Sequence, residues 1–71
     1  MTPQELARQL TATRKENKIT QQEVADYIGC HISQVQSIEY RPEINRKVQT
    51  YINYAEAIGC ELEFFLKPLG T

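Results

Sequence analysis

Residues 21–40 of this 71-residue chain read QQEVADYIGCHISQVQSIEY, and this stretch decides the fold. Its apolar residues form two stripes at helical spacing, namely Val24, Ala25 and Ile28, and then Val35 and Ile38. Gly29 lies between the stripes, where a chain leaving a helix often needs a positive φ that glycine adopts at little cost. Ala25 is small, which lets a second helix cross the first closely. The stretch therefore predicts two short helices joined by a tight turn.

Two helices at this spacing form a helix-turn-helix, the motif whose second helix enters the major groove of DNA. The formal net charge of −1 argues mildly against this interpretation, because domains that bind nucleic acid are usually basic. The charges are unevenly distributed, however. Basic residues cluster at 14–18 and 41–47, and acidic residues gather near the C-terminus. A chain with one basic face can still bind phosphates, with a modest dependence on salt.

Length and composition limit the other classes of protein. Seventy-one residues make one domain near the lower limit for a self-sufficient core, so dimerisation would help it. No apolar run approaches the ~20 residues of a membrane span, and the N-terminus lacks the regions of a signal peptide. We therefore expect a cytoplasmic protein with no membrane contact.

The reactive residue types are sparse. Cys30 and Cys60 are expected to be small buried apolar residues, since a disulfide would be rare in the cytosol. With His31 as the single histidine and no Cys-x-x-Cys spacing, we predict no metal site and no cofactor. The chain has no plausible nucleophile with its base and no glycine-rich phosphate loop, so we do not expect an enzyme.

Capping signals give the starts of the helices. Thr2-Pro3-Gln4-Glu5 and Thr20-Gln21-Gln22-Glu23 each have the form of a capping box before an apolar stripe. Either His31 or Ser33 could cap the third helix, which should end before Pro42. A further stripe consists of Val48, Tyr51, Ile52, Ala55 and Ile58, and Gly59 would end that helix. The predicted helices span about residues 3–17, 21–28, 32–40 and 46–58.

The tail, residues 60–71, fits two structures. Leu62, Phe64 and Leu66 alternate with charged residues, which is a strand pattern, whereas Leu62, Phe65 and Leu66 would fit a short fifth helix. The strand is favoured. It would pair with its copy across a twofold axis, which makes Leu62, Phe64 and Leu66 the predicted dimerisation residues. The fold class is therefore mainly α, with a four-helix DNA-binding domain over residues 1–59 and a C-terminal strand, or with five helices if the tail is helical.

With these elements placed, residues from about Leu6 to Gly59 resemble the Cro/repressor-type (XRE-like) helix-turn-helix family. The matching residues are Arg14, Ile19, Thr20, Gln21, Gln22, Glu23, Ala25, Gly29, Val35, Ile38, Glu39, Ala55, Ile58 and Gly59. Several fixed offsets agree at once, which is a stronger signal than any one of them. The chain departs from the family at Arg41, where glycine is usual, and in a loop one residue longer.

The resemblance implies which residues contact double-stranded DNA. The early face of the third helix would read base edges, and its residues are Ile32, Ser33, Gln34, Gln36 and Ser37. Ile32 could instead pack at the turn. Gln21 would approach a phosphate or brace the third helix, with Gln22 beside it, although both could simply be a solvated helix start. The residues beside the loop would position the protein on the DNA backbone, and these are Tyr40, Arg41, Arg46 and Lys47.

The resemblance also implies an ion pair between Arg14 and Glu39, which would fix the third helix against the first. The alternative is two independent surface charges. Three functions are compatible with the domain. It could be a homodimeric repressor of a palindromic operator, an antitoxin that also binds its toxin, or an adaptor that binds another protein partner.

Overall fold

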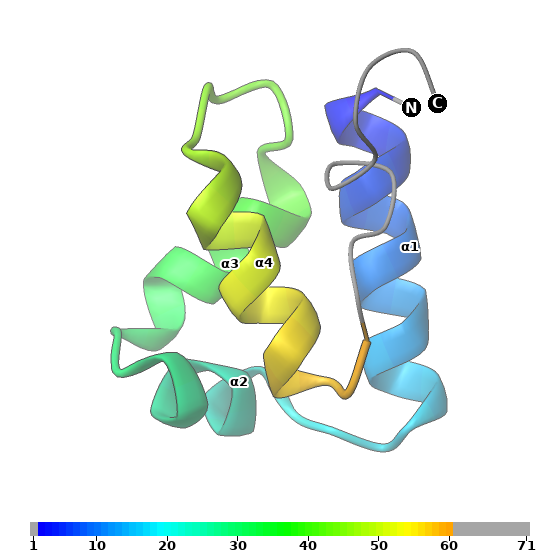
Figure 1. The fold of residues 1–71 in the computed structure, drawn as a ribbon, viewed down its shortest axis with the longest axis vertical. Coiled ribbons are helices and arrows are strands. Elements are labelled where there is room, and N and C mark those ends of the chain that lie inside the picture. The colour runs from blue at the N-terminus through cyan, green and yellow to red at the C-terminus, as the bar shows by residue number, and fades with distance from the viewer. Residues whose placement is uncertain (1, 61–71) are drawn as a thin grey trace, which may run out of the picture.

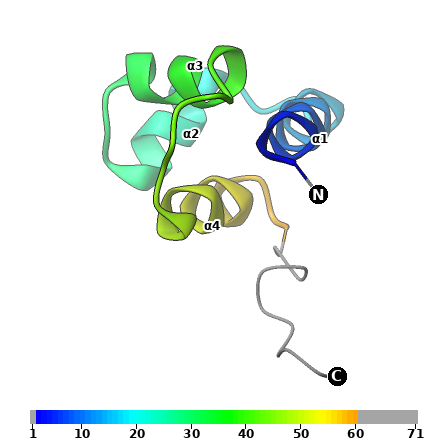
Figure 2. The same ribbon diagram turned by 90° about the horizontal axis from the view of Figure 1, so that it is seen from above.

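The computed structural model describes residues 2–60, and this part of the chain is helical. Its elements are α1 (Pro3–Glu16), α2 (Gln21–Ile28), α3 (Ile32–Tyr40) and α4 (Val48–Ala57) (Figure 1). The four helices surround one core, with α2 packed against α3 and α4, and α1 packed against α3 (Figure 2). The mainly α fold class is confirmed. The predicted C-terminal strand, with Leu62, Phe64 and Leu66, lies outside the described residues.

The ends of α2 follow the predicted capping rules. Thr20 Oγ1 accepts a hydrogen bond from the Glu23 N–H at 3.1 Å, and the Glu23 carboxylate accepts one from the Thr20 N–H at 2.9 Å. At the other end Gly29 has φ +83°, and its N–H donates to the Ala25 carbonyl at 2.8 Å. This left-handed residue reverses the chain direction without the steric penalty that a side chain would bring. The turn between α2 and α3 is therefore built as the sequence predicts.

The starts of α1 and α3 are also capped by side chains. Thr2 Oγ1 accepts a hydrogen bond from the Glu5 N–H at 3.1 Å, which is the first half of the predicted capping box. At α3, where two caps were possible, His31 is the capping residue, and its side chain accepts a hydrogen bond from the Ser33 N–H.

The start of α4 differs from the prediction by two residues. The helix begins at Val48, because Arg46 lies in the preceding loop with its guanidinium bonded to the carbonyls of Arg41 and Ile44. Lys47, the N-cap residue, is extended and makes no side-chain capping bond. The capping rules gave no signal here because this helix start is held by a loop contact.

The core contains most of the predicted stripes, with Ile28 and Ile52 half-buried against it and one exchange on α4. Its buried members are Leu6, Leu10, Val24, Ala25, Val35, Ile38, Tyr51, Tyr54, Ala55 and Ile58. Val48 is wrong as a core residue, since it lies in the first turn of α4 and is 46% exposed, and Tyr54 is fully buried instead. Cys30 and Cys60 are free thiols that pack against the core, half-buried where burial was expected.

Candidate nucleic-acid interface

The third helix buries one face and presents the other to solvent. Val35 and Ile38 lie in the core, as predicted. The polar residues assigned to base reading lie elsewhere on the helix, with Ser33 and Gln34 exposed and Gln36 and Ser37 half-buried. Figure 2 shows α3 at the periphery of the molecule. A helix placed this way can offer polar side chains to a DNA groove.

The first turn of α3 is fixed by His31. Its Nδ1 accepts a hydrogen bond from the Ser33 N–H at 3.1 Å and lies 2.9 Å from the Ser33 Oγ. Ile32 is half-buried and packs against the core, which matches the alternative in which it fills the turn. The exposed polar groups of this turn therefore belong to His31 and Ser33, on either side of Ile32.

The last turn of α3 is fixed by a buried carboxylate. Arg14 forms a bidentate ion pair with Glu39, with Nε 2.8 Å from Oε2 and Nη2 3.1 Å from Oε1. Tyr54 donates its hydroxyl to Oε2 at 2.5 Å, and Gln21 donates its amide to Oε1 at 3.0 Å. The Glu39 side chain is only 1% exposed. The structure thus brings the two predicted partners together inside the domain, and Arg14 does not belong to an exposed basic cluster.

The electrostatics of this cluster follow from burial and pairing. Burial alone would raise the pKa of Glu39, but the hydrogen bonds from Arg14, Tyr54 and Gln21 outweigh it and lower that pKa. Burial also works against the charge of Arg14, whose pKa is nevertheless raised by its contact with Glu39. Burial and the bond to the carboxylate both raise the pKa of Tyr54. The cluster therefore holds one anion and one cation, with a neutral phenol, near neutral pH.

Tyr54 is the member of this cluster that the sequence analysis missed. The apolar stripe of α4 was read without it, because its hydroxyl makes tyrosine a poor marker of a core face. Its position three residues after Tyr51 and one before Ala55 places it on that face. A tyrosine can bury its ring if its hydroxyl finds a hydrogen-bond partner. The expected buried carboxylate of Glu39 is such a partner, and it could have indicated that Tyr54 is buried.

Gln21 braces α2 against α3. Its amide nitrogen donates to Glu39 and, at 3.1 Å, to the hydroxyl of Tyr40, and its amide oxygen accepts a hydrogen bond from Gln36 at 3.4 Å. The bracing role given to this residue in the sequence analysis is therefore present in the structure. The phosphate contact stays a prediction, and it would have to use the backbone N–H at the start of α2 or replace one of these bonds.

Arg46 acts within the protein. Its guanidinium donates to the carbonyl of Arg41 at 2.8 Å, to that of Ile44 at 3.2 Å and to the Oγ of Ser37 at 2.5 Å. These bonds close the α3–α4 loop and tie it to Ser37 on α3. The phosphate contact expected of Arg46 stays a prediction, and the loop-closing role is one that the sequence analysis missed.

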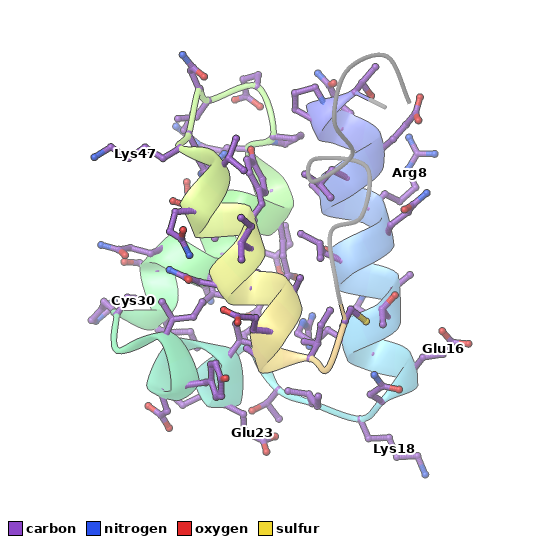
Figure 3. The ribbon with its side chains drawn as sticks, in the orientation of Figure 1. Arg8, Glu16, Lys18, Glu23, Cys30 and Lys47 are labelled. Carbon is purple, nitrogen blue, oxygen red and sulfur yellow. The ribbon has the colours of Figure 1, made fainter. Side chains whose placement is uncertain are left out.

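The other predicted backbone contacts lie on the surface. Tyr40 is 69% exposed, Arg41 and Lys47 are exposed, and Lys47 extends away from the body of the domain (Figure 3). Gln22 is exposed on α2, where its amide donates to Asp26 at 2.9 Å. Exposed donors therefore lie at the C-terminal end of α3, in the following loop and on α2.

Residues 10–65, most of the chain, match the family model described as Helix-turn-helix. The chain therefore belongs to the helix-turn-helix family, of the Cro/repressor (XRE-like) type that the sequence indicated. It is, at that level, a DNA-binding transcriptional regulator. No curated protein and no solved structure gave a significant match. Within residues 2–60 no helix is long and apolar enough to cross a membrane, and no cluster of metal-binding side chains occurs.

Proposed function

We propose that this protein is a homodimeric repressor that reads a palindromic operator with α3 in the major groove. The observation that carries the proposal is the anchoring of α3, whose last turn is bonded to three other helices through Glu39 while Ser33 and Gln34 face solvent. Base readout needs side chains held in place by a rigid support. Gln34 is suited to adenine, with which glutamine forms a bidentate pair.

Phosphate contacts would come from the exposed donors around α3. Tyr40 ends α3, Arg41 and Lys47 lie in the loop that follows, and the first turn of α2 adds backbone N–H groups. These few contacts predict a shallow salt dependence, since each phosphate neutralised adds about −0.9 to the slope of log affinity against log salt. Occupation of an operator blocks transcription without any cofactor.

The dimer follows from the geometry of operator binding. One α3 spans only a few base pairs, and paired half-sites lie about one helical turn, roughly 34 Å, apart. We assign the interface to Leu62, Phe64 and Leu66, on the strand pattern of the tail. Replacing Leu62 and Leu66 together with lysine should give monomers in sedimentation. A dimer that persists in that variant would place the interface elsewhere.

The first experiment is a binding titration over a range of salt concentrations. The probe is the DNA upstream of the protein's own gene, and the control is random DNA of equal length. Selective binding at physiological salt supports the repressor, and Gln34→Ala should then weaken it by about 1–3 kcal/mol. Gln49→Ala is the matched control, because Gln49 is exposed on α4 and bonds only within that helix. Equal weak binding to both DNAs would favour an antitoxin or adaptor that acts through a protein partner.

A further inference from the structure

Residues 41–47 form the loop between α3 and α4, and hydrogen bonds fix the path of its first part. The Ile44 N–H donates to the Arg41 carbonyl at 3.2 Å, which closes a turn inside the loop. The Arg46 guanidinium donates to the carbonyls of the same two residues, at 2.8 Å to Arg41 and at 3.2 Å to Ile44. Ile44 therefore has a defined place in the loop.

The same guanidinium joins Ile44 to α3. Arg46 Nη1 donates to the Ile44 carbonyl, and Arg46 Nη2 donates to the Ser37 Oγ at 2.5 Å. Both nitrogens belong to one rigid, planar group, so the backbone of Ile44 and the hydroxyl of Ser37 lie close together. Ser37 is one of the residues expected to read bases. Ile44 is thus held beside that part of α3.

Ile44 and the outer side of α3 line one groove of about 350 Å³. Its residues are Ser33, Gln36, Ser37, Tyr40, Arg41 and Ile44. Ile44 is the aliphatic member of this set, and it is 41% exposed. The other members carry hydroxyl, amide or guanidinium groups. The groove therefore combines polar groups from α3 with one accessible apolar side chain from the loop.

Building on the proposed function, we infer that Ile44 reads the methyl group of a thymine. With α3 in the major groove of DNA, base edges approach the groove that Ile44 lines. Thymine presents an apolar methyl group there, whereas the other three bases present hydrogen-bonding atoms. An isoleucine packed against those atoms would remove their water and give no bond in return. Ile44 therefore favours thymine at the position it contacts, and it extends base reading from α3 into the loop.

Ile32 is the other isoleucine of this region, and it differs from Ile44 in two ways. Ile32 is half-buried and packs against the core, whereas the side chain of Ile44 is exposed. Ile32 also begins α3, whereas Ile44 follows the end of that helix. The two side chains would therefore contact different base pairs, and substitution of Ile44 alone can identify its own thymine.

The test uses duplexes that the wild-type protein selects from a randomised DNA library at physiological salt. Each thymine of a selected half-site is replaced in turn by uracil, which lacks the methyl group and keeps the hydrogen-bonding atoms. At one position uracil should weaken wild-type binding by about fourfold, the value of burying one methyl-sized group. Ile44→Ala should bind the thymine and uracil duplexes equally at that position.

A second comparison tests the methyl group without thymine. 5-Methylcytosine carries a methyl group at the corresponding place in the major groove. With cytosine at the identified position, methylation should strengthen wild-type binding by about fourfold and leave Ile44→Ala unchanged. If Ile44 contacts a deoxyribose instead, neither the uracil nor the methylcytosine replacement will have an Ile44-dependent effect, and the inference is overturned.

Further variants separate the methyl contact from a general effect on the protein. Val48→Ala is the matched control, because Val48 is 46% exposed and does not line this groove. It should keep the full methyl effect. Ile44→Asn places a polar group at the same site and should lose the effect, whereas Ile44→Val keeps a branched apolar side chain and should retain most of it. Circular dichroism checks that each variant is folded.

Three outcomes would overturn the inference while the proposed function stands. These are a selective protein with no uracil-sensitive thymine, a sensitivity that is unchanged in Ile44→Ala and Ile44→Asn, or an equal loss of the sensitivity in Val48→Ala. If the wild-type protein selects no sequence from the library, the proposed function fails together with the inference. That failure is visible at the first step, before any base or residue is replaced.

Discussion

The N-terminal end of α3 is held by groups close to it in the sequence, whereas its C-terminal end is held by groups from all three other helices. At the surface, His31 caps the helix by accepting a hydrogen bond from the N–H of Ser33, two residues away. Glu39 binds Arg14, Gln21 and Tyr54, which lie 25, 18 and 15 residues away. A local cap can be lost without disturbing the rest of the domain. A carboxylate shared by three helices cannot, so the two ends should respond very differently to substitution.

The largest effect is expected at Glu39. Glu39→Ala leaves the Arg14 guanidinium buried without its carboxylate, which should lower the free energy of unfolding by on the order of 3–5 kcal/mol. Urea titration followed by circular dichroism measures this. Glu16→Ala is the control, because Glu16 is exposed at the end of α1, and it should change stability by less than about 0.5 kcal/mol (Figure 3). Equal effects of the two variants would contradict the view that Glu39 holds α3 to the other three helices.

A smaller effect is expected from the hydroxyl of Tyr54. Tyr54→Phe keeps the buried ring and removes one of the bonds to Glu39, so the free energy of unfolding should fall by roughly 1–3 kcal/mol. Tyr27→Phe is the matched control, since Tyr27 is 64% exposed on α2. If Tyr54→Phe is as stable as the wild type, Arg14 and Gln21 are sufficient to hold the carboxylate.

The same hydroxyl should make the domain sensitive to alkali. The pKa of Tyr54 is raised in the folded protein above its ordinary value of 10.0, by burial first and then by Glu39. The folded state therefore keeps its proton where the unfolded chain loses it. The stabilisation is complete below pH 10.0 and declines as the pH rises above that value. Urea titrations across this range should show a steeper loss for the wild type than for Tyr54→Phe, and parallel curves would exclude the effect.

The smallest effect is expected at the local end. His31→Ala removes one cap and should lower the free energy of unfolding by about 1 kcal/mol, with His31→Asn restoring most of it. Thermal unfolding of the three proteins gives the ranking. A loss as large as that of Glu39→Ala would show that the two ends of α3 are not held differently.

The contrast between the two ends also explains what could be predicted from the sequence. The capping box at Thr20 and the left-handed Gly29 depend on residues within one turn, and both were predicted. The bond from Tyr54 to Glu39 and the loop closure by Arg46 depend on how distant segments meet. Helical periodicity predicts which face of a helix is buried. It does not predict which distant group a buried polar side chain will bond. The Arg14–Glu39 pair was expected only because the resemblance to a family supplied it.

The position of Tyr54 in the chain has a consequence for biosynthesis. The carboxylate of Glu39 acquires its last described partner from α4, after α1, α2 and α3 have already been made. A nascent chain that ends before α4 has Arg14 and Gln21 in place but lacks part of the core and the third donor. The anchor of α3 is therefore completed only when α4 has left the ribosome. A truncated product should not compete with the intact protein for an operator.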